Sequence, residues 1–158
     1  FFMRWTHMCL IFAEAANRVS GPTAALYGYT PKQAIAFLRS RPTNNGIPGV
    51  GSTADPYLDE CAAAGRDVFE TLVRNERRIE LCFEQLRYFD TRRWLIADQT
   101  DGGPFYGMNV DAGNSFTDEA FYEKTVFETR VFRPEFYLFP IPQSEINRDP
   151  QIVQNPGW

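Results

Sequence analysis

The stretch from Asp67 to Trp94 constrains the fold most, because it has the spacing of a long amphipathic helix. Its apolar residues follow one another at intervals of three, seven, four and three positions: Phe69, Leu72, Ile79, Phe83 and Leu86. This spacing is typical of a helical face packed against a core. The interval of seven contains Glu76, where the pattern requires a hydrophobic residue. Burying an isolated carboxylate is costly, so we predict a cationic or backbone donor beside Glu76.

Charged residues form a second stripe beside the apolar one. Its members are three, four and three positions apart: Arg77, Glu80, Glu84 and Arg87. Residues at these intervals are neighbours on a helix and can exchange ion pairs along it. The simpler alternative is a charged, coiled-coil-like face that packs against a neighbouring helix, with Glu76 at its edge. We expect the helix to bend or restart near residues 85–87 and to continue as a short helix with Tyr88, Phe89 and Trp94 as packing groups.

Composition restricts the class of protein. The 158 residues are 44% hydrophobic and 15% aromatic, which indicates a globular chain with a real core. A net charge of -4, with arginines interleaved with acids, argues against a broad nucleic-acid surface. No apolar run is long enough to cross a bilayer. The three cysteines have no metal-binding spacing, and we predict Cys9 and Cys82 to be small core residues.

The first part of the chain reads as helices. Apolar residues predict a helix over about 3–18 with Trp5, Cys9, Phe12 and Ala16 on one face. Thr30 followed by Pro31 predicts the start of a second helix that ends near Arg39 and forms a hairpin with the first. Residues 41–65 have loop composition, with a short helical turn over 57–64. Because the sequence starts inside an apparent helix, we expect residues 1–158 to be the carboxyl-terminal portion of a longer protein.

The second part is irregular. Residues 100–119 are rich in Gly, Asn and Asp and predict a long functional loop. Alternation over residues 125–132 predicts a short strand, with residues 135–139 as its partner or as extended chain. Four prolines, at positions 140, 142, 150 and 156, predict an irregular tail with one helical turn at residues 142–146.

Three segments together resemble one family. MCLIFAEAAN is similar to its helix LxxAEAxN, and NERRIELCFEQLRYFDTRRW is similar to ERRxELxFEGxRxxDLxRW. The end of the chain, FYLFPIPQSEINRDPQIVQNPGW, resembles YLxPIPxxEIxxNPxLxQNPGY/W. Their order and spacing resemble the SusD/RagB family of outer-membrane nutrient-binding lipoproteins. The chain departs from the pattern at Gln85, where the family has Gly, and at Leu86, Thr91 and Asp149.

The resemblance implies a mainly α fold of tetratricopeptide-like helical hairpins, with long irregular loops and a short β element near the C-terminus. It also implies a lipoprotein exposed at the surface of the outer membrane, anchored by a lipid outside this chain. Its partners would be an oligosaccharide ligand, a TonB-dependent (SusC-like) transporter and the N-terminal remainder of the same protein. The implied function is non-enzymatic capture of oligosaccharides and their delivery to that transporter, without a cofactor.

Two sets of residues are the candidates for function within this framework. We predict a structural ion-pair network with the following members: Glu76, Arg77, Glu80, Glu84, Arg87, Asp90, Arg92 and Arg93. A sugar site needs flat aromatic rings with polar groups at their rims. That mixture gives the predicted ligand-binding residues: Tyr57, Asp59, Phe105, Tyr106, Asn109, Asn114 and Phe116. Alternatively, the loop aromatics only hold the loop closed.

Catalysis and metal binding have weaker support. Paired glutamates could hydrolyse a glycosidic bond, but neighbouring arginines lower a carboxyl pKa, the wrong direction for a general acid. His7 is the only histidine, and no nucleophile motif accompanies it, so we predict a packing role. The acids of the loop lack the spacing of a calcium loop. We therefore predict no catalytic residue, no metal site and no cofactor; a helical-repeat scaffold for protein partners and an all-α glycosidase remain the alternatives.

Overall fold

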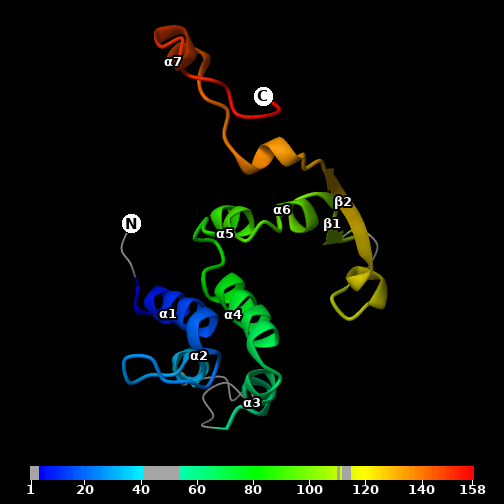
Figure 1. Ribbon diagram of the computed structural model, residues 1–158. Coiled ribbons are helices and arrows are strands. Elements are labelled where there is room, and N and C mark those ends of the chain that lie inside the picture. Colours follow the sequence, from blue (N-terminus) through cyan, green and yellow to red (C-terminus); the bar gives the residue numbers. More distant parts are fainter. Residues whose placement is uncertain (1–3, 41–53, 110, 112–114) are drawn as a thin grey trace. The chain divides into compact units, whose positions relative to one another are not determined.

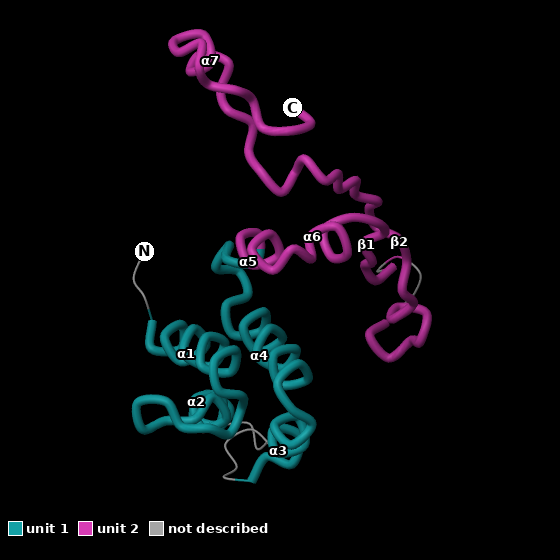
Figure 2. The backbone as a smooth tube through the Cα atoms, viewed as in Figure 1, with its two compact units in different colours: residues 1–87 teal, residues 88–158 magenta. Residues whose placement is uncertain are grey.

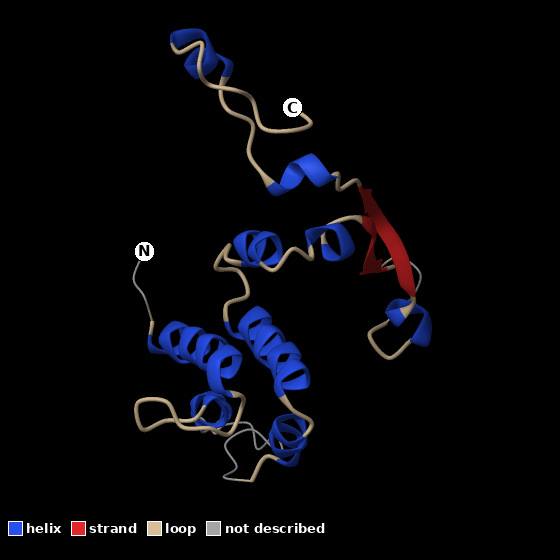
Figure 3. Cartoon of the chain, in the orientation of Figure 1, coloured by secondary structure: helices blue, strands red, loops and turns tan. Residues whose placement is uncertain are grey.

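The computed structural model describes residues 4–40, 54–109, 111 and 115–158. The chain divides into two compact units, Phe1–Arg87 and Tyr88–Trp158 (Figure 2). The described part is mostly helical with one two-stranded sheet, which confirms the predicted fold class (Figure 3).

The described residues of the first unit form four helices (Figure 1). They are α1 (Trp5–Ser20), α2 (Pro31–Arg39), α3 (Pro56–Ala63) and α4 (Arg66–Glu80). Helix α1 packs against both α2 and α4, and α3 packs against α4. All four were predicted, and α2 has the predicted bounds.

Local sequence explains where these helices begin. The Thr30 side chain accepts a hydrogen bond from the Gln33 backbone N–H, and the Gln33 side chain accepts one from the Thr30 N–H. This reciprocal capping satisfies two backbone donors at the start of α2. Asp55 caps α3 without this reciprocal bond, and its side chain accepts from the Leu58 N–H.

The core of the first unit lies between α1, α2, α3 and α4. Its members are buried apolar side chains from all four helices: Cys9, Leu10, Ala13, Ile35, Leu38, Leu58, Cys61, Ala62, Phe69, Leu72, Val73 and Leu81. Phe69 is fully buried, as its place in the apolar pattern predicts. Burial of Cys9 confirms its predicted core position and raises the pKa of its thiol.

The long helix is shorter than predicted. Helix α4 ends at Glu80, and Phe83 and Gln85 both have a positive φ, of 64° and 62°. Residues other than glycine rarely adopt this left-handed backbone conformation, and a residue in it cannot continue a right-handed helix. Phe83, predicted to lie on the apolar face, is therefore fully exposed, while Leu86 packs against the core as predicted.

Two other residues near this break are also more exposed than predicted. Cys82, predicted to be a core residue, is exposed, and so is Ile79 in the last turn of α4. The apolar periodicity continues in the sequence past the point where the helix ends. Periodicity alone could not reveal the break.

The second unit contains short elements joined by irregular segments. They are α5 (Arg87–Arg93, whose first residue belongs to the first unit), α6 (Ala97–Thr100), β1 (Gly103–Met108), η1 (Glu119–Tyr122), β2 (Lys124–Arg130), η2 (Pro134–Tyr137) and α7 (Gln143–Arg148). Strand β2 and the helical turn α7 were predicted. Of the packing groups expected here, Trp94 is buried, whereas Tyr88 and Phe89 are exposed.

The partner of β2 differs from the prediction. It pairs antiparallel with β1, which lies inside the segment expected to be a loop, and not with residues 135–139. Most of those residues form the 3-10 turn η2. A sequence rich in glycine concealed β1, since glycine is rare in strands.

Candidate functional site

Arg39, the last residue of α2, connects three helices of the first unit. Its Nη1 donates to Oε1 of Glu76 on α4 at 2.5 Å, and its Nε donates to Oδ2 of Asp55, the cap of α3. The guanidinium also lies 5.8 Å from the ring centroid of Tyr57. Glu76 is buried, and Arg39 is the cationic donor that the sequence predicted beside Glu76.

The charges around Arg39 stabilise each other. Burial raises the pKa of Asp55, but the hydrogen bonds from Arg39 and from the Leu58 N–H outweigh it, so the net shift is downward. The hydrogen bond to Asp55 is the main reason why the pKa of Arg39 is raised. Asp55 is thus held as a carboxylate at neutral pH, a state suited to an ion pair and unsuited to a general acid.

Other members of the predicted network also contact distant segments. Arg77 is buried, and its Nη2 lies 3.3 Å from Nε2 of His7 on α1. Arg4 pairs with Glu84 and donates to the Glu80 carbonyl at 3.2 Å. These contacts join the start of α1 to the end of α4, whereas the sequence suggested ion pairs along one helix.

Arg92 has a comparable place in the second unit. Its Nε donates to the Phe136 carbonyl at 3.2 Å, and its Nη1 donates to the Tyr88 carbonyl at 3.1 Å and to Oδ2 of Asp101 at 3.2 Å. The guanidinium stacks on the Tyr88 ring, 3.5 Å from its centroid. One side chain therefore fixes η2 against α5.

The remaining network members lie on α5. Asp90 is buried and accepts a hydrogen bond from Nε of Arg93 at 2.8 Å. Arg87, the first residue of α5, is half-buried. The structure pairs the carboxylates of Glu76, Glu84 and Asp90 with arginines, and the role of the network in stability stays a prediction.

The predicted ligand-binding residues are divided between the two units. Tyr57 and Asp59 lie on α3 in the first unit, where Lys32 pairs with Asp59 at 2.7 Å. Phe105, Tyr106 and the residues after them belong to the second unit.

The β1–β2 ribbon separates the two central aromatics. Phe105 and Tyr106 are consecutive in β1, so their side chains point to opposite faces. The register slips between them, since Phe105 pairs with Glu128 and Tyr106 with Val126. Phe127 is the extra residue of this bulge.

Each ring of β1 has a cation stacked on it. Arg130 lies 4.3 Å from the ring centroid of Phe105, and Lys124 lies 4.6 Å from that of Tyr106. Tyr106 is half exposed beside Val126, whereas Phe105 is partly covered. Of the predicted aromatics in the second unit, Tyr106 presents a half-exposed ring with a charged hydrogen-bond donor over it.

Two loop residues support local structure. Asn109 accepts a hydrogen bond from the Asp111 N–H at 3.3 Å. The exposed Phe116 ring contacts the Phe121 ring edge-on at 5.0 Å between centroids. Asn114 lies outside the described residues.

The carboxyl-terminal motif closes on the segment that precedes α7. Gln154 accepts from the Ile141 N–H at 2.8 Å and donates to the Ile141 carbonyl at 2.9 Å. Asn155 donates to the Phe139 carbonyl at 2.7 Å, and the Trp158 indole donates to the Glu135 carbonyl at 3.1 Å. These bonds replace the backbone pairing that a proline-rich segment lacks.

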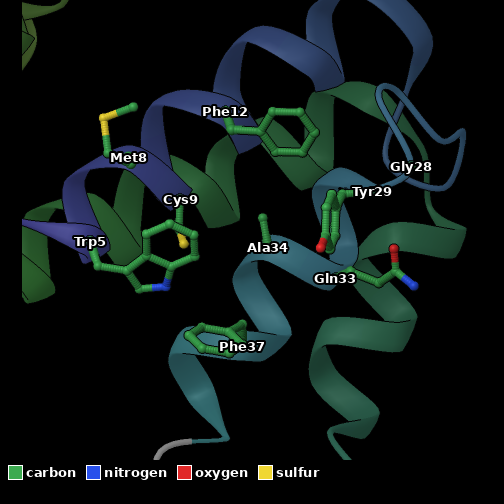
Figure 4. A pocket seen from close by; sticks show the side chains of 9 residues that line it. All are labelled: Trp5, Met8, Cys9, Phe12, Gly28, Tyr29, Gln33, Ala34 and Phe37. Carbon is green, nitrogen blue, oxygen red and sulfur yellow. The ribbon is translucent and has the colours of Figure 1, made fainter.

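The sequence interpretation missed an apolar cavity in the first unit (Figure 4). It has a volume of about 560 Å³ and is lined by side chains from α1, α2 and the segment between them: Trp5, Met8, Cys9, Phe12, Gly28, Tyr29, Gln33, Ala34 and Phe37. A signal existed, because Trp5 and Phe12 belong to the predicted apolar face, and Met8 lies three positions after Trp5 and four before Phe12.

No group of three or more potential metal ligands occurs among the residues that the structure describes. Within the same residues, no helix has the length and apolar character needed to cross a membrane.

Comparison with known proteins identifies relatives. The family model SusD_RagB, described as the SusD family, matches residues 1–158. The SusD-like protein P2 of Formosa agariphila is 26% identical over 99% of this chain and 25% of its own length.

Solved structures are similar too. A SusD-like protein from Bacteroides fragilis superposes with a TM-score of 0.67 at 25% identity, covering 99% of this chain and 25% of that one. The selenomethionine structure of BT4246 superposes with a TM-score of 0.75 at 24% identity, over 100% of this chain and 24% of the other, which shows the fold alone. The chain thus spans about a quarter of the length of these relatives.

Proposed function

The chain belongs to the SusD family, and from this premise we propose that it is part of a protein that captures oligosaccharides without enzymatic turnover. The longer protein would hold this chain as its carboxyl-terminal portion. It would be a lipoprotein of the outer membrane, exposed at the cell surface, and would deliver its ligand to a TonB-dependent transporter.

The observation that supports a sugar contact in this chain is the Tyr106 face of the ribbon. Sugars bind through stacking of their C–H faces on aromatic rings and through hydrogen bonds at the rim. Tyr106 is half exposed, and the ammonium group of Lys124 lies 4.6 Å from its ring centroid. Phe127, exposed on the same ribbon, serves as the comparison.

A binding role fits the carboxylates better than glycoside hydrolysis. A hydrolytic pair needs one carboxyl group with a raised pKa and a second one facing the same bond. Glu76 is buried and held by Arg39, and Glu84 is paired with Arg4. Under this proposal the protein hydrolyses no glycan, so changing Glu76, Glu80 or Glu84 to Gln would remove no hydrolytic activity.

Calorimetry of the longer protein against a panel of oligosaccharides tests the proposal. We expect binding of at least one oligosaccharide without release of reducing ends, and capture of a barrel transporter from outer membranes. Tyr106→Ala should weaken binding, whereas Phe127→Ala should leave it unchanged. Absence of binding across the panel would overturn the proposed function, and equal affinities of the two variants would remove Tyr106 from the site.

A further inference from the structure

The first helix has a second apolar stripe in addition to the one that faces the core. Its members, Trp5, Met8 and Phe12, line the cavity described above together with Phe37 on α2 (Figure 4). Trp5 and Phe37 meet edge-on with centroids 6.0 Å apart, and both are more than half exposed, at 66% and 57%. A contiguous exposed apolar surface of this kind is typical of an interaction site.

The chemistry of the lining restricts the occupant. Polar side-chain groups come from few of the lining residues, chiefly Tyr29 and Gln33, while the others contribute aromatic, aliphatic and sulfur atoms. A sugar would lose hydrogen bonds to water here without replacing most of them. Apolar side chains would lose none, and a groove between two helices accommodates the apolar face of a third.

The source of such a helix follows from the length of the relatives. This chain spans about a quarter of them, and α1 and α2 form a helical hairpin. Hairpins of stacked helical proteins bury their remaining apolar face against a neighbouring unit of the same chain. We propose that the α1–α2 groove is the docking site of an amphipathic helix from the remainder of the same polypeptide. This inference does not depend on the proposed sugar-binding function.

Cysteine labelling in the longer protein tests the docking. Met8→Cys reports from the groove, and Val68→Cys on α4 is its matched control, since both native side chains are 46% exposed in this chain. Both variants are made with Cys82→Ser, because Cys82 is exposed. We expect maleimide to react with Met8→Cys at least tenfold more slowly than with Val68→Cys in the folded protein, and at equal rates in urea.

Phe37→Cys, on the other wall of the groove, provides a second measurement if Met8→Cys fails to fold. Equal labelling rates in the folded protein at both groove positions and the control would overturn the proposal. Protection that rises with protein concentration would assign the groove to a second copy, and protection that needs added oligosaccharide would assign it to a ligand. Either result would also overturn it.

Discussion

Replacing Arg39 by Met should destabilise the first unit more than any change to an exposed ion pair. Arg39 holds the carboxylates of both Glu76 and Asp55, whose side chains are 8% and 12% exposed. Removing one partner of a buried pair costs about 3–5 kcal/mol. Because 25% of the Arg39 side chain is exposed, solvent screens part of this interaction, and we expect a loss of about 2–3 kcal/mol.

Urea unfolding and thermal melting, followed by circular dichroism, measure this loss. A change of 2–3 kcal/mol corresponds to a melting temperature lower by about 4–12 °C for a chain of this size. Glu76→Gln should cost less, about 1 kcal/mol, because Arg39 keeps Asp55 as its partner. In the double variant the two losses should not add, since both changes disrupt one ion pair.

Arg148→Met is the matched control, because Arg148 forms an ion pair with Glu145 at 3.0 Å while 76% of its side chain is exposed. That change should leave the unfolding midpoint where it is. The reasoning would be refuted if Arg39→Met were as harmless as Arg148→Met, or if it abolished oligosaccharide binding by the longer protein without lowering its melting temperature.

Three further predictions concern backbone strain, side-chain geometry and pH. Gln85→Gly should raise the melting temperature by a few degrees, because Gln85 has a φ of 62° and a non-glycine residue in that conformation costs about 1–2 kcal/mol. An unchanged melting temperature would show that the backbone at Gln85 is not strained. Arg92→Lys should speed amide hydrogen exchange in η2, because Lys has no planar fork to hold Phe136 and Asp101 together; unchanged exchange would exclude Arg92 as the fixing group. The pKa of Glu70 is lowered, because the hydrogen bonds from Arg18 and Arg74 outweigh the rise due to burial. The ionised Glu70 therefore stabilises the fold above about pH 4.3, and this stabilisation is lost as the pH falls. Glu70→Gln should therefore melt at a lower temperature than the native chain at pH 7, and this difference should shrink as the pH falls below about 4.3.

Local sequence signals were sufficient to predict the helices of the first unit. Thr30 and Pro31 fixed the start of α2, because a capping side chain and a proline act on the nearest backbone groups. The end of α4 was predicted wrongly, since apolar spacing continues through Phe83 while its backbone adopts a left-handed turn. The family has glycine where this chain has Gln85, and glycine is typical of a positive φ. That position was therefore the sequence signal for the break.

Pairing between distant residues was beyond the sequence. The spacing placed Glu76 on a buried face and required a cation there, but 37 positions separate it from Arg39, and only the packing of α2 on the same core brings them together. The same holds for β1, whose glycines argue against a strand until β2 supplies its hydrogen bonds. The predicted aromatic site was divided for a similar reason, because a strand sends Phe105 and Tyr106 to opposite faces.

The sequence by itself determined the family, the helical class and the need for a charged partner at Glu76. These depend on short intervals along the chain and on side-chain chemistry. The tertiary structure alone decided which cation meets that carboxylate, which strand pairs with β2, and that Trp5, Met8 and Phe37 share a groove. Contacts of this kind form between segments far apart in the chain, and local propensity carries no information about which distant segment will be the neighbour.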